Sequence, residues 1–522
     1  MLAALAGLLC LSGCRHPVDQ ADFVFLNGAE PETLDPSLIT GQPEMRLAQA
    51  LFEGLTSFDE NGQIIPGVAE KWDISPDGKV YTFHLRKDAK WSNGEPVTAR
   101  DFRDTWQRTL APETASEYAY QLYYVHNGEP YNEGKLKDFS QTGIEVLDDF
   151  TLRVTLDNST PFFLGLCATS PLYPEYIPVV QKWGDEWIKP GHLVGNGPYL
   201  LDTWRINDQV RFVKNPLYWD AAHVALKTIE ALPISRASTA LNFYCAGQAS
   251  LLLDKGLIPP ALISDLRKRP DFHSAPFLGT YFIRFNVTRA AFKDARVRRA
   301  FSLVVDKRLI VDKITRAGEI PAAGLVPPGA AGYQPPPGLD YNPDEARRLL
   351  AAAGYPGGKG FPLVTYLYSE GELNEAIAVE LQSMFRQELG VNIALQRQEW
   401  KVYLNTMNNL DYDMARSSWV GDYDDPNTFL DMFVTGGGNN ETGFANPKYD
   451  QLIADAAEQT DQAKRFGIFQ QAEHMLVSEE APVCPLYYYV GIELYDPDKL
   501  GGMAANLLDE HPLGRMYWKT AR

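Results

Sequence analysis

Residues 411–431 read DYDMARSSWVGDYDDPNTFLD, a short strand followed by an acidic turn. Tyr412 to Val420 is predicted as the strand. The Asp425–Pro426 step predicts the turn, because a residue before proline disfavours the helical conformation. A strand end with open backbone and a nearby carboxylate suits an extended peptide, which can pair with the strand and place its ammonium on the acid. A surface loop with solvated acids is the more common outcome for such residues taken alone.

The region before this stretch predicts an α/β layer. Leu363–Tyr368 and Val391–Gln396 are predicted strands, and Glu372–Leu389 between them is a predicted helix. Pro343–Gly354 is a further helix, for which Asn342 provides the N-cap. A strand, a helix and a strand in succession indicate a three-layer α/β lobe.

Length and composition restrict the class of protein. A chain of 522 residues predicts two to four domains. Its 45% apolar and 22% charged residues are typical of globular proteins. The net charge of −19 argues against a nucleic-acid partner and against docking on anionic lipid through charge.

The N-terminus predicts a targeting segment. Residues 1–13 are apolar and small, and the run is too short for a permanent membrane span. Leu11–Cys14 reads Leu-Ser-Gly-Cys and is similar to the bacterial lipobox, so residues 1–13 are predicted as a lipoprotein signal peptide and Cys14 as the lipidated residue. Residues 14–22 then form a tether. This predicts a periplasmic or cell-surface protein anchored to a membrane by lipid alone. An uncleaved apolar N-terminus with an incidental cysteine is the alternative. The sequence also departs from the lipoprotein pattern in one feature, since no Lys or Arg precedes the apolar run.

No catalytic or metal-binding motif is present in the sequence. The eight histidines include no His-Glu-x-x-His, and the chain contains no Gly-x-Ser-x-Gly and no phosphate-binding glycine loop. We therefore predict a protein that is not an enzyme and uses no cofactor and no metal. Besides Cys10 and Cys14, the cysteines are Cys167, Cys245 and Cys484, which allow one disulfide at most. Three buried thiols are favoured over a disulfide.

Several longer motifs resemble one family, the oligopeptide-binding branch of the family 5 solute-binding lipoproteins that serve bacterial ABC importers. The most specific is the ungapped block Tyr81–Phe102, and the others, in chain order, are Pro31–Pro36, Leu51–Leu55, Pro66–Trp72, Asn196–Tyr199, Asn215–Trp219, Arg296–Arg298 and Tyr487–Val490. The resemblance covers nearly the whole chain after the signal segment. It implies that the protein captures short peptides and delivers them, as a monomer, to an ABC permease.

The resemblance also implies an α/β fold of the periplasmic-binding-protein-like type II (cluster C), with two lobes that close on a ligand and a third inserted lobe. Lobe I is expected from residues 23–55, 180–275 and 488–522. Lobe II is the insertion at 56–179, and lobe III is 276–487. The strands that cross between lobes I and III are expected near 275 and 487, where they act as a hinge.

The resemblance extends to the positions of the family's ligand site. Asp422 is implied to pair with the peptide ammonium, and Ser417, Ser418 and Trp419 to pair with the peptide backbone. The full set of implied ligand-binding residues is Thr40, Gly41, Gln42, Tyr118, Trp400, Arg416, Ser417, Ser418, Trp419, Asp422 and Tyr489.

The sequence departs from its relatives where some of them hold the ligand's carboxylate. The corresponding residues Ser302, Asn374 and Met407 are uncharged, which leaves Arg416 as the remaining cation for the far end of the ligand. A family disulfide is absent too, since Gly279 and Val420 occupy its positions. Longer peptides, murein peptides or an altered pocket therefore stay open. So does a non-peptide solute as the ligand, and a surface hydrolase is a less favoured function for the chain.

Overall fold

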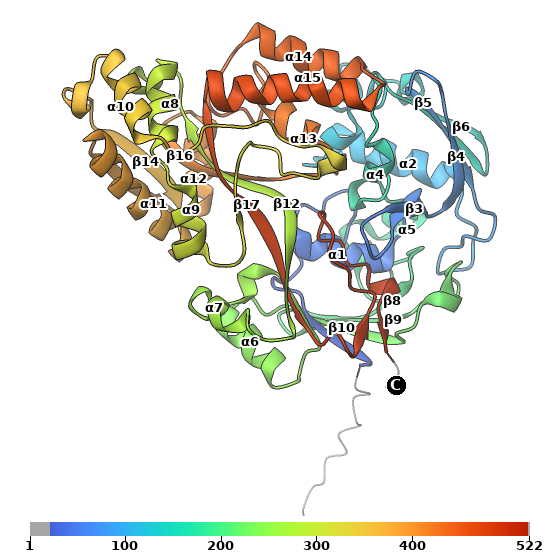
Figure 1. The fold of residues 1–522 in the computed structure, drawn as a ribbon. Helices are drawn as coiled ribbons and strands as arrows, with labels where there is room; N and C mark the ends of the chain where they lie inside the picture. The colour runs from blue at the N-terminus through green and yellow to red at the C-terminus, as the bar shows by residue number, and fades with distance from the viewer. Residues whose placement is uncertain (1–20, 520–522) are drawn as a thin grey trace, which may run out of the picture.

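The computed structural model describes residues 21–519 (Figure 1). The predicted signal segment 1–13, Cys14 and most of the tether lie outside these residues. Within 21–519, no helix has both the length and the apolar character needed to cross a membrane.

A sheet of 11 strands runs through the molecule. Two long antiparallel strands, β12 (Phe272–Phe285) and β17 (Val483–Tyr495), form its centre (Figure 1). On one side β12 is followed by β16 (Met414–Val420), β14 (Val364–Ser369) and β15 (Ile393–Gln398). On the other side β17 is followed by β11 (Leu251–Leu253), β1 (Phe23–Leu26), β10 (Thr228–Leu232), β9 (Gln209–Lys214) and β8 (Tyr199–Arg205), while β13 (Ile320–Pro321) pairs with β17.

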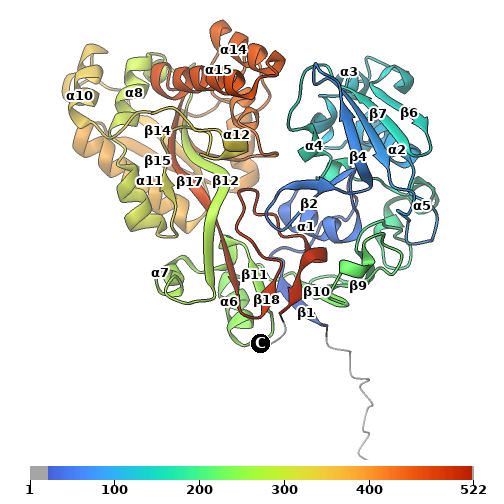
Figure 2. The same cartoon turned by 45° about the vertical axis from the view of Figure 1, so that its right-hand side comes forward.

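The two central strands join the two halves of the sheet, as Figure 2 shows. β12 pairs with β16 only from Gly279 to Phe285, and β17 pairs with β11 only from Glu493 onward. The register between β12 and β17 shifts between Pro276 and Thr280. This irregular segment therefore lies where the strands pass from one half to the other. The division of the chain into three lobes stays a prediction.

The predicted βαβ unit is confirmed on the β16 side. β14 and β15 are parallel, and α11 (Glu372–Met384) connects them and continues as a π-helical turn to Leu389. α10 (Pro343–Ala352) begins at the predicted cap, where the Asn342 side chain accepts the amide hydrogen of Glu345. α8 (Ala295–Leu303) packs on α10. α14 (Pro447–Glu458) and α15 (Gln462–His474) lie above the central strands (Figure 1).

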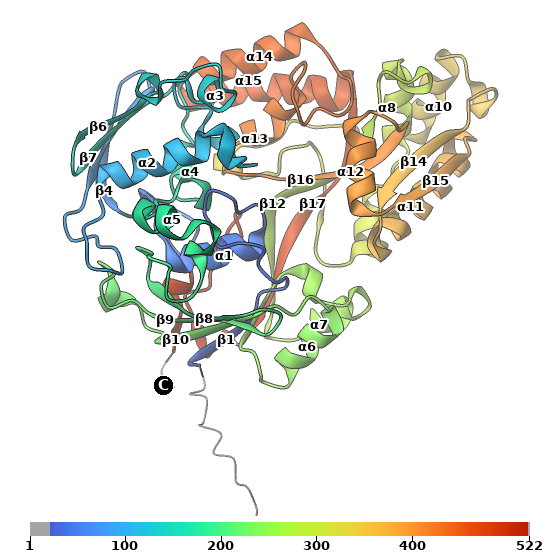
Figure 3. The same ribbon diagram turned by 180° about the vertical axis from the view of Figure 1, so that it is seen from behind.

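A separate sheet of four strands lies at the other end of the molecule (Figure 3). Its order is β4 (Ala69–Ile74), β5 (Val80–Leu85), β7 (Thr151–Thr155) and β6 (Ile144–Asp148). α2 (Ala99–Leu110) packs against it and buries Phe102 and Trp106 completely. Thr98 and Asp101 form a capping box at the start of α2.

Shorter elements complete the chain. The helices are α1 (Gln42–Leu51), α3 (Gly128–Asn132), α4 (Phe163–Leu166), α5 (Ile177–Trp183), α6 (Ala237–Cys245), α7 (Ile263–Leu266), α9 (Lys307–Leu309), α12 (Trp400–Asn408) and α13 (Asn427–Leu430). The strands are β2 (Thr56–Phe58), β3 (Ile64–Pro66), β18 (Leu500–Gly501) and β19 (Tyr517–Trp518). After β17 the C-terminal segment, red in Figures 1 and 2, folds back beside α1.

The described cysteines are all unpaired. Cys167 and Cys484 are buried, as expected from the sequence, whereas Cys245 is exposed at the end of α6. The expectation of three buried thiols is therefore wrong for Cys245. α6 ends at this residue, so its side chain lies at the surface rather than in the core.

Candidate functional site

A cavity of about 670 Å³ lies between the two halves of the molecule. Its walls come from segments that are far apart in sequence, including the start of α1, residues 161–173, the loop after β16 and the C-terminal segment. Five of the predicted ligand-binding residues line it, namely Thr40, Gln42, Tyr118, Asp422 and Tyr489. The fold thus gathers both sides of the predicted site around one space.

Asp422 follows the end of β16 and faces this cavity. Its amide donates to Thr428 Oγ1 (3.2 Å), and its Oδ2 accepts a hydrogen bond from Tyr120 Oη (3.0 Å). Burial raises the pKa of the Asp422 carboxyl to about 6, although the Tyr120 hydrogen bond opposes the shift. Within residues 21–519, no cation lies at ion-pair distance from this carboxylate. A partly desolvated acid with one neutral donor is well suited to bind an incoming ammonium.

β16 has an open edge, and Val420 at its end lines the cavity. Along one edge it pairs with β12 throughout, but on the other edge β14 reaches only Met414 and Ala415. The Arg416 carbonyl accepts a hydrogen bond from the Tyr403 hydroxyl. In the described sheet, residues 417–420 therefore have no strand partner on that edge, and an extended chain could pair there.

The side chains of this strand serve different purposes. Ser417 is buried, and its hydroxyl accepts a hydrogen bond from Arg284 Nε (3.0 Å). Trp419 Nε1 donates to Thr428 Oγ1 (3.3 Å), so the indole is fixed beside Asp422. Ser418 pairs with Tyr281 across the sheet. None of the three lines the cavity by its side chain, and their predicted role through the backbone stays a prediction.

Arg416 lies beneath the cavity wall rather than in it. Its guanidinium stacks over the Tyr281 ring at 5.1 Å, and its Nε has no hydrogen-bond partner. No carboxylate of the described chain forms an ion pair with it. A partly buried cation without a counter-charge is costly, and cation–π contact offsets only part of that cost.

The aromatic wall centres on Tyr489. This residue is half-buried on β17 and makes an edge contact with Tyr487 at 5.8 Å. It packs directly on Gly279, where a Cβ would lie 2.5 Å from the ring. The ring of Tyr118 lies next to that of Tyr120, with 5.5 Å between their centroids and a tilt of 32°. Trp400 is the first residue of α12, and its side chain lies outside the described part of the structure.

Of the three uncharged positions, Ser302 and Met407 are buried and Asn374 is half-buried. Ser302 donates to the Arg298 carbonyl, and Met407 is buried against Leu367 and Tyr403. Asn374 accepts from the Tyr281 hydroxyl. None of them lines the cavity, so these positions provide no cation to it.

Neighbouring acids of the 411–431 stretch have structural partners. Asp425 forms a two-point ion pair with Arg465 (2.6 and 2.8 Å), and both side chains are only 3% exposed. Asp424 lines the cavity and accepts the amide hydrogen of Ala331. Within the described residues, Asp422 and Asp424 are thus the acids of this cluster without a cationic partner.

Some residues of the cavity were not predicted from sequence. Tyr120 and Thr428 hold Asp422, and Leu508 to His511 of the C-terminal segment form part of the wall. Gly41 lies between two lining residues, and a Cβ there would meet the Glu44 carboxylate. The contact between Tyr120 and Asp422 joins residues 302 positions apart, so it leaves no periodic pattern in the sequence. The Tyr-rich run at 118–124 is the one local feature that could have indicated a role for Tyr120.

Within residues 21–519, Glu493, Asp509 and His511 form a group that could hold a metal ion, because their possible ligand atoms lie within 4.8 Å of one another. Burial lowers the pKa of His511, but hydrogen bonds with Asp509 and Glu493 outweigh it and raise the pKa to about 9. The imidazole is therefore protonated at neutral pH, and a protonated imidazole has no lone pair for a metal ion. The group is an ion-paired cluster.

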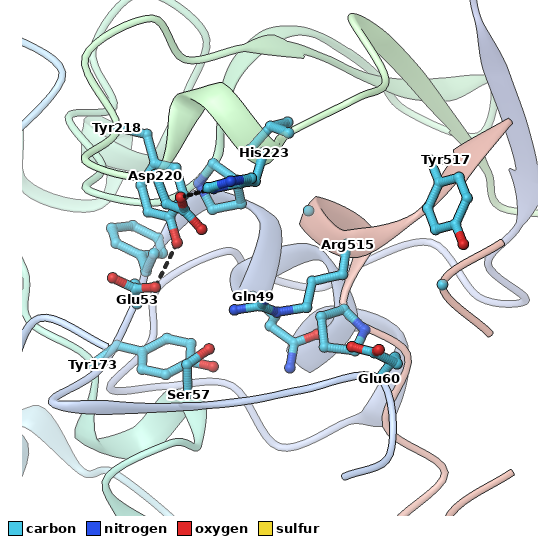
Figure 4. Close-up of a pocket in the computed structure, with 16 residues that line it drawn as sticks. Gln49, Glu53, Ser57, Glu60, Tyr173, Tyr218, Asp220, His223, Arg515 and Tyr517 are labelled. Carbon is cyan, nitrogen blue, oxygen red and sulfur yellow. Dashed lines mark hydrogen bonds and ion pairs between the residues drawn. The ribbon is translucent and has the colours of Figure 1, made fainter. Parts of the chain in front are cut away.

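A second, smaller cavity of about 270 Å³ lies near the C-terminal end of α1 (Figure 4). Glu53 is buried there, accepts hydrogen bonds from Tyr218 and Trp219, and has a pKa raised to about 7 by burial. Figure 4 shows Arg515 pointing into this space. Gln49 and Tyr173 line both cavities. No residue of β16 reaches the smaller one, so it is distinct from the predicted ligand site.

Comparisons with known proteins identify the family. The profile of the bacterial extracellular solute-binding proteins, family 5, matches residues 63–441. The chain is 38% identical over 502 residues to the periplasmic oligopeptide-binding protein OppA of Escherichia coli, covering 94% of this chain and 91% of that protein. It is 37% identical to the periplasmic murein peptide-binding protein MppA of the same organism, covering 90% and 88%.

A solved structure agrees with these relatives. Haemophilus influenzae OppA in complex with the peptide RPPGFSPFR has a TM-score of 0.78 to this chain, at 33% identity and with 96% and 100% coverage. The fold is accordingly the mixed α/β, type II periplasmic-binding-protein-like fold that the sequence predicts. The relatives are named as binding proteins and not as enzymes. The chain belongs to the bacterial extracellular solute-binding proteins of family 5.

Proposed function

We propose that this protein is an extracytoplasmic receptor that binds short peptides in the 670 Å³ cavity and delivers them to an ABC import permease. The observation that carries the proposal is Asp422, a desolvated carboxylate at the open end of β16 with a single neutral donor. Every unmodified peptide brings an α-ammonium and a backbone that can pair with a strand edge. The site offers a complement to each.

Recognition of these shared groups explains how varied side chains can be accepted. Residues 417–419 provide backbone for pairing, while Thr40, Gly41 and Gln42 face the ligand from α1, and Tyr118, Trp400 and Tyr489 act as walls. Ordered water can fill side-chain pockets at little cost. Micromolar affinity requires only about 8 kcal/mol in total. Arg416 becomes the cation nearest to the far end of the ligand, once lobe closure or the ligand itself displaces the aromatic ring that covers the guanidinium.

Calorimetry with a tripeptide and its N-acetylated form tests this proposal. The free peptide should bind at least tenfold more tightly, because acetylation removes the charge that Asp422 needs. Native mass spectrometry of the purified protein should show co-purified peptides. Equal affinity for the two forms would contradict the role of Asp422, and failure to bind any peptide would contradict the function.

The same measurements distinguish peptides from different ligand classes. Oligosaccharides, metal chelates and haem carry no α-ammonium, so a shift in melting temperature with one of them and none with peptides would replace the proposal. A murein peptide would bind in the same cavity and would be recognised by its own mass. Turnover of any added peptide or glycan would point to a surface hydrolase.

The three-lobe division supplies the expected motion. Lobe I (23–55, 180–275 and 488–522) and lobe III (276–487) would close around the cavity, with lobe II (56–179) attached to lobe I. The register shift between Pro276 and Thr280 is where β12 can absorb the rotation. Small-angle scattering should report a smaller radius of gyration after peptide addition, and an unchanged radius would exclude closure.

The location follows from the relatives and from the N-terminus. Relatives are periplasmic or extracellular solute-binding proteins. The sequence Leu11–Cys14 adds the inference that the protein is anchored through a lipid on Cys14. The family resemblance adds the inference that it acts as a monomer. A labelled fatty acid should be incorporated into the wild-type protein and not into Cys14→Ser. Incorporation into both would refute the anchor.

A further inference from the structure

The main cavity contains a second carboxylate in the same condition as Asp422. Glu510, in the C-terminal segment, lines the cavity and accepts one hydrogen bond on Oε2 from Gln49 Nε2 (3.0 Å). Within the described chain, no cation forms an ion pair with it. Burial raises the pKa of the Glu510 carboxyl, while Gln49 and the more distant His511 and Arg46 oppose the shift.

The position of this carboxylate is fixed by its backbone. The Glu510 amide donates to Asn506 Oδ1 (3.0 Å), and Asn506 Nδ2 donates back to the Glu510 carbonyl (2.8 Å). α1 holds Gln49 opposite. Glu510 is therefore held rigidly at the cavity wall, as a binding group must be.

Charge around Glu510 is not balanced. Three carboxyl groups, Glu493, Asp509 and Glu510, gather with two cations, His511 and Arg46. His511 is shared between Asp509 and Glu493 at 3.3 and 3.8 Å, and Arg46 donates to Asn27 Oδ1. Burial is also the main cause that raises the pKa of Glu493, to about 7. An excess of carboxylate over cation in a buried wall is stabilised either by a proton or by a cation from the ligand.

We propose that Glu510 forms a second cation-binding point in the cleft, which accepts the side-chain ammonium or guanidinium of a lysine or arginine in the bound peptide. The inference rests on the proposed function and adds to it a preference for peptides with a basic side chain. Asp422 would take the N-terminal ammonium and Glu510 the side-chain cation. Ser302, Asn374 and Met407 are uncharged and lie outside the cavity, so they add no competing charge.

Calorimetry in EDTA with a tripeptide panel tests the proposal. Three peptides carry lysine at position 1, 2 or 3 of an otherwise alanine sequence, and three carry norleucine at the same positions. At one position lysine should bind about tenfold or more tightly than norleucine, as for a charge-assisted hydrogen bond. Glu510→Gln, which can still accept from Gln49, should abolish that advantage and leave norleucine peptides unchanged.

Asp424→Asn is the matched control, because it removes a charge from the same cavity wall. The lysine advantage should persist in this variant. Loss of the lysine advantage in both variants would assign it to the overall electrostatic field of the cavity and would overturn the role of Glu510. Equal binding of lysine and norleucine peptides at all three positions would overturn it as well. An advantage that appears only when Zn²⁺ replaces EDTA would overturn it in favour of a metal site at His511.

Two further results keep the test decisive. If Glu510→Gln fails to fold by circular dichroism, Glu510→Lys should instead favour a glutamate peptide over the lysine peptide, and no reversal would refute the inference. Binding of trialanine to the wild-type protein separates the two levels of the argument. With trialanine bound and no lysine advantage, only the role of Glu510 fails; with no peptide bound at all, both fail.

Discussion

The hydroxyl of Tyr120 donates a 3.0 Å hydrogen bond to Oδ2 of Asp422, and this contact joins residues 302 positions apart across the cavity. It links the segment after α2 to the end of β16. The hydrogen bond orients the carboxylate without neutralising it. A neutral donor therefore keeps Asp422 available for a ligand cation while it favours the ionised form.

Asp422→Asn should weaken the binding of a free peptide by about 2–5 kcal/mol, as expected when one partner of a buried charge pair is lost. Calorimetry gives the affinity directly. The affinity of the N-acetylated peptide should be nearly the same for Asp422→Asn as for the wild type, since this peptide never forms the ion pair. Asp424→Asn is the control within the same stretch, and an equal loss in that variant would contradict the assignment.

Peptide affinity should fall with acidity below pH 6. The pKa of Asp422 is about 6 in the unliganded protein, so each pH unit below that value reduces the ionised fraction about tenfold. Binding titrations between pH 8 and pH 4.5 should show a bend near pH 6 in the affinity profile of the wild type, where the affinity begins to fall. The affinity of Asp422→Asn should stay constant over the same range. A pH-independent affinity in the wild type would be inconsistent with an ion pair.

The same pKa has an opposite effect on the stability of the unliganded fold. The folded-state pKa of Asp422 lies above its value of 3.8 in an unfolded chain, so the folded state binds the proton more tightly. This contribution to the free energy of unfolding is fully present below pH 3.8 and is lost as the pH rises through about 6. In urea titrations without peptide, the free energy of unfolding of Asp422→Asn relative to that of the wild type should therefore be larger at pH 8 than at pH 5.

Tyr120→Phe should lower peptide affinity by about 0.5–1.5 kcal/mol, because a single neutral hydrogen bond is lost. It should also move the bend in the pH profile upward, since the hydrogen bond stabilises the ionised carboxylate. Tyr123→Phe is the matched control. Its hydroxyl donates to Asn132 rather than to Asp422, so the position of the bend should stay unchanged.

Arg465→Met should destabilise the fold by about 3–5 kcal/mol, because it leaves Asp425 as an unpaired buried charge. The free energy of unfolding in urea measures this loss. Arg153→Met removes an exposed ion pair with Glu145 and should cost no more than about 1 kcal/mol. Comparable losses in the two variants would mean that Asp425 is not held by Arg465 in solution.

Local sequence signals predicted much of the fold. The capping box at Thr98 and Asp101 and the cap at Asn342 involve residues only three positions apart, so they can be recognised from the sequence alone. The βαβ unit was predicted for the same reason. The sequence does not predict α12, because Trp400–Asn408 closely follows a strand and no Ser, Thr, Asp or Asn directly precedes it.

The site divides in the same manner. Asp422 and Tyr489 could be named because each lies in a motif that matches the family. Tyr120 and Glu510 could not, since their roles depend on which distant segments meet at the cavity. Arg416 was named as a ligand residue, but only the structure shows that Tyr281 covers its guanidinium. Tertiary contacts of this kind leave no spacing pattern.

The open edge of β16 has a consequence for solubility. An unpaired strand edge is a template on which other chains can add, and proteins normally cover or charge such edges. Here the free edge of residues 417–420 ends at Val420, which lines a cavity whose walls come from both halves of the molecule. The surrounding walls therefore leave less room for a strand of another folded protein than for a short extended segment. The edge proposed to bind the peptide is thus also the edge that its surroundings shield from aggregation.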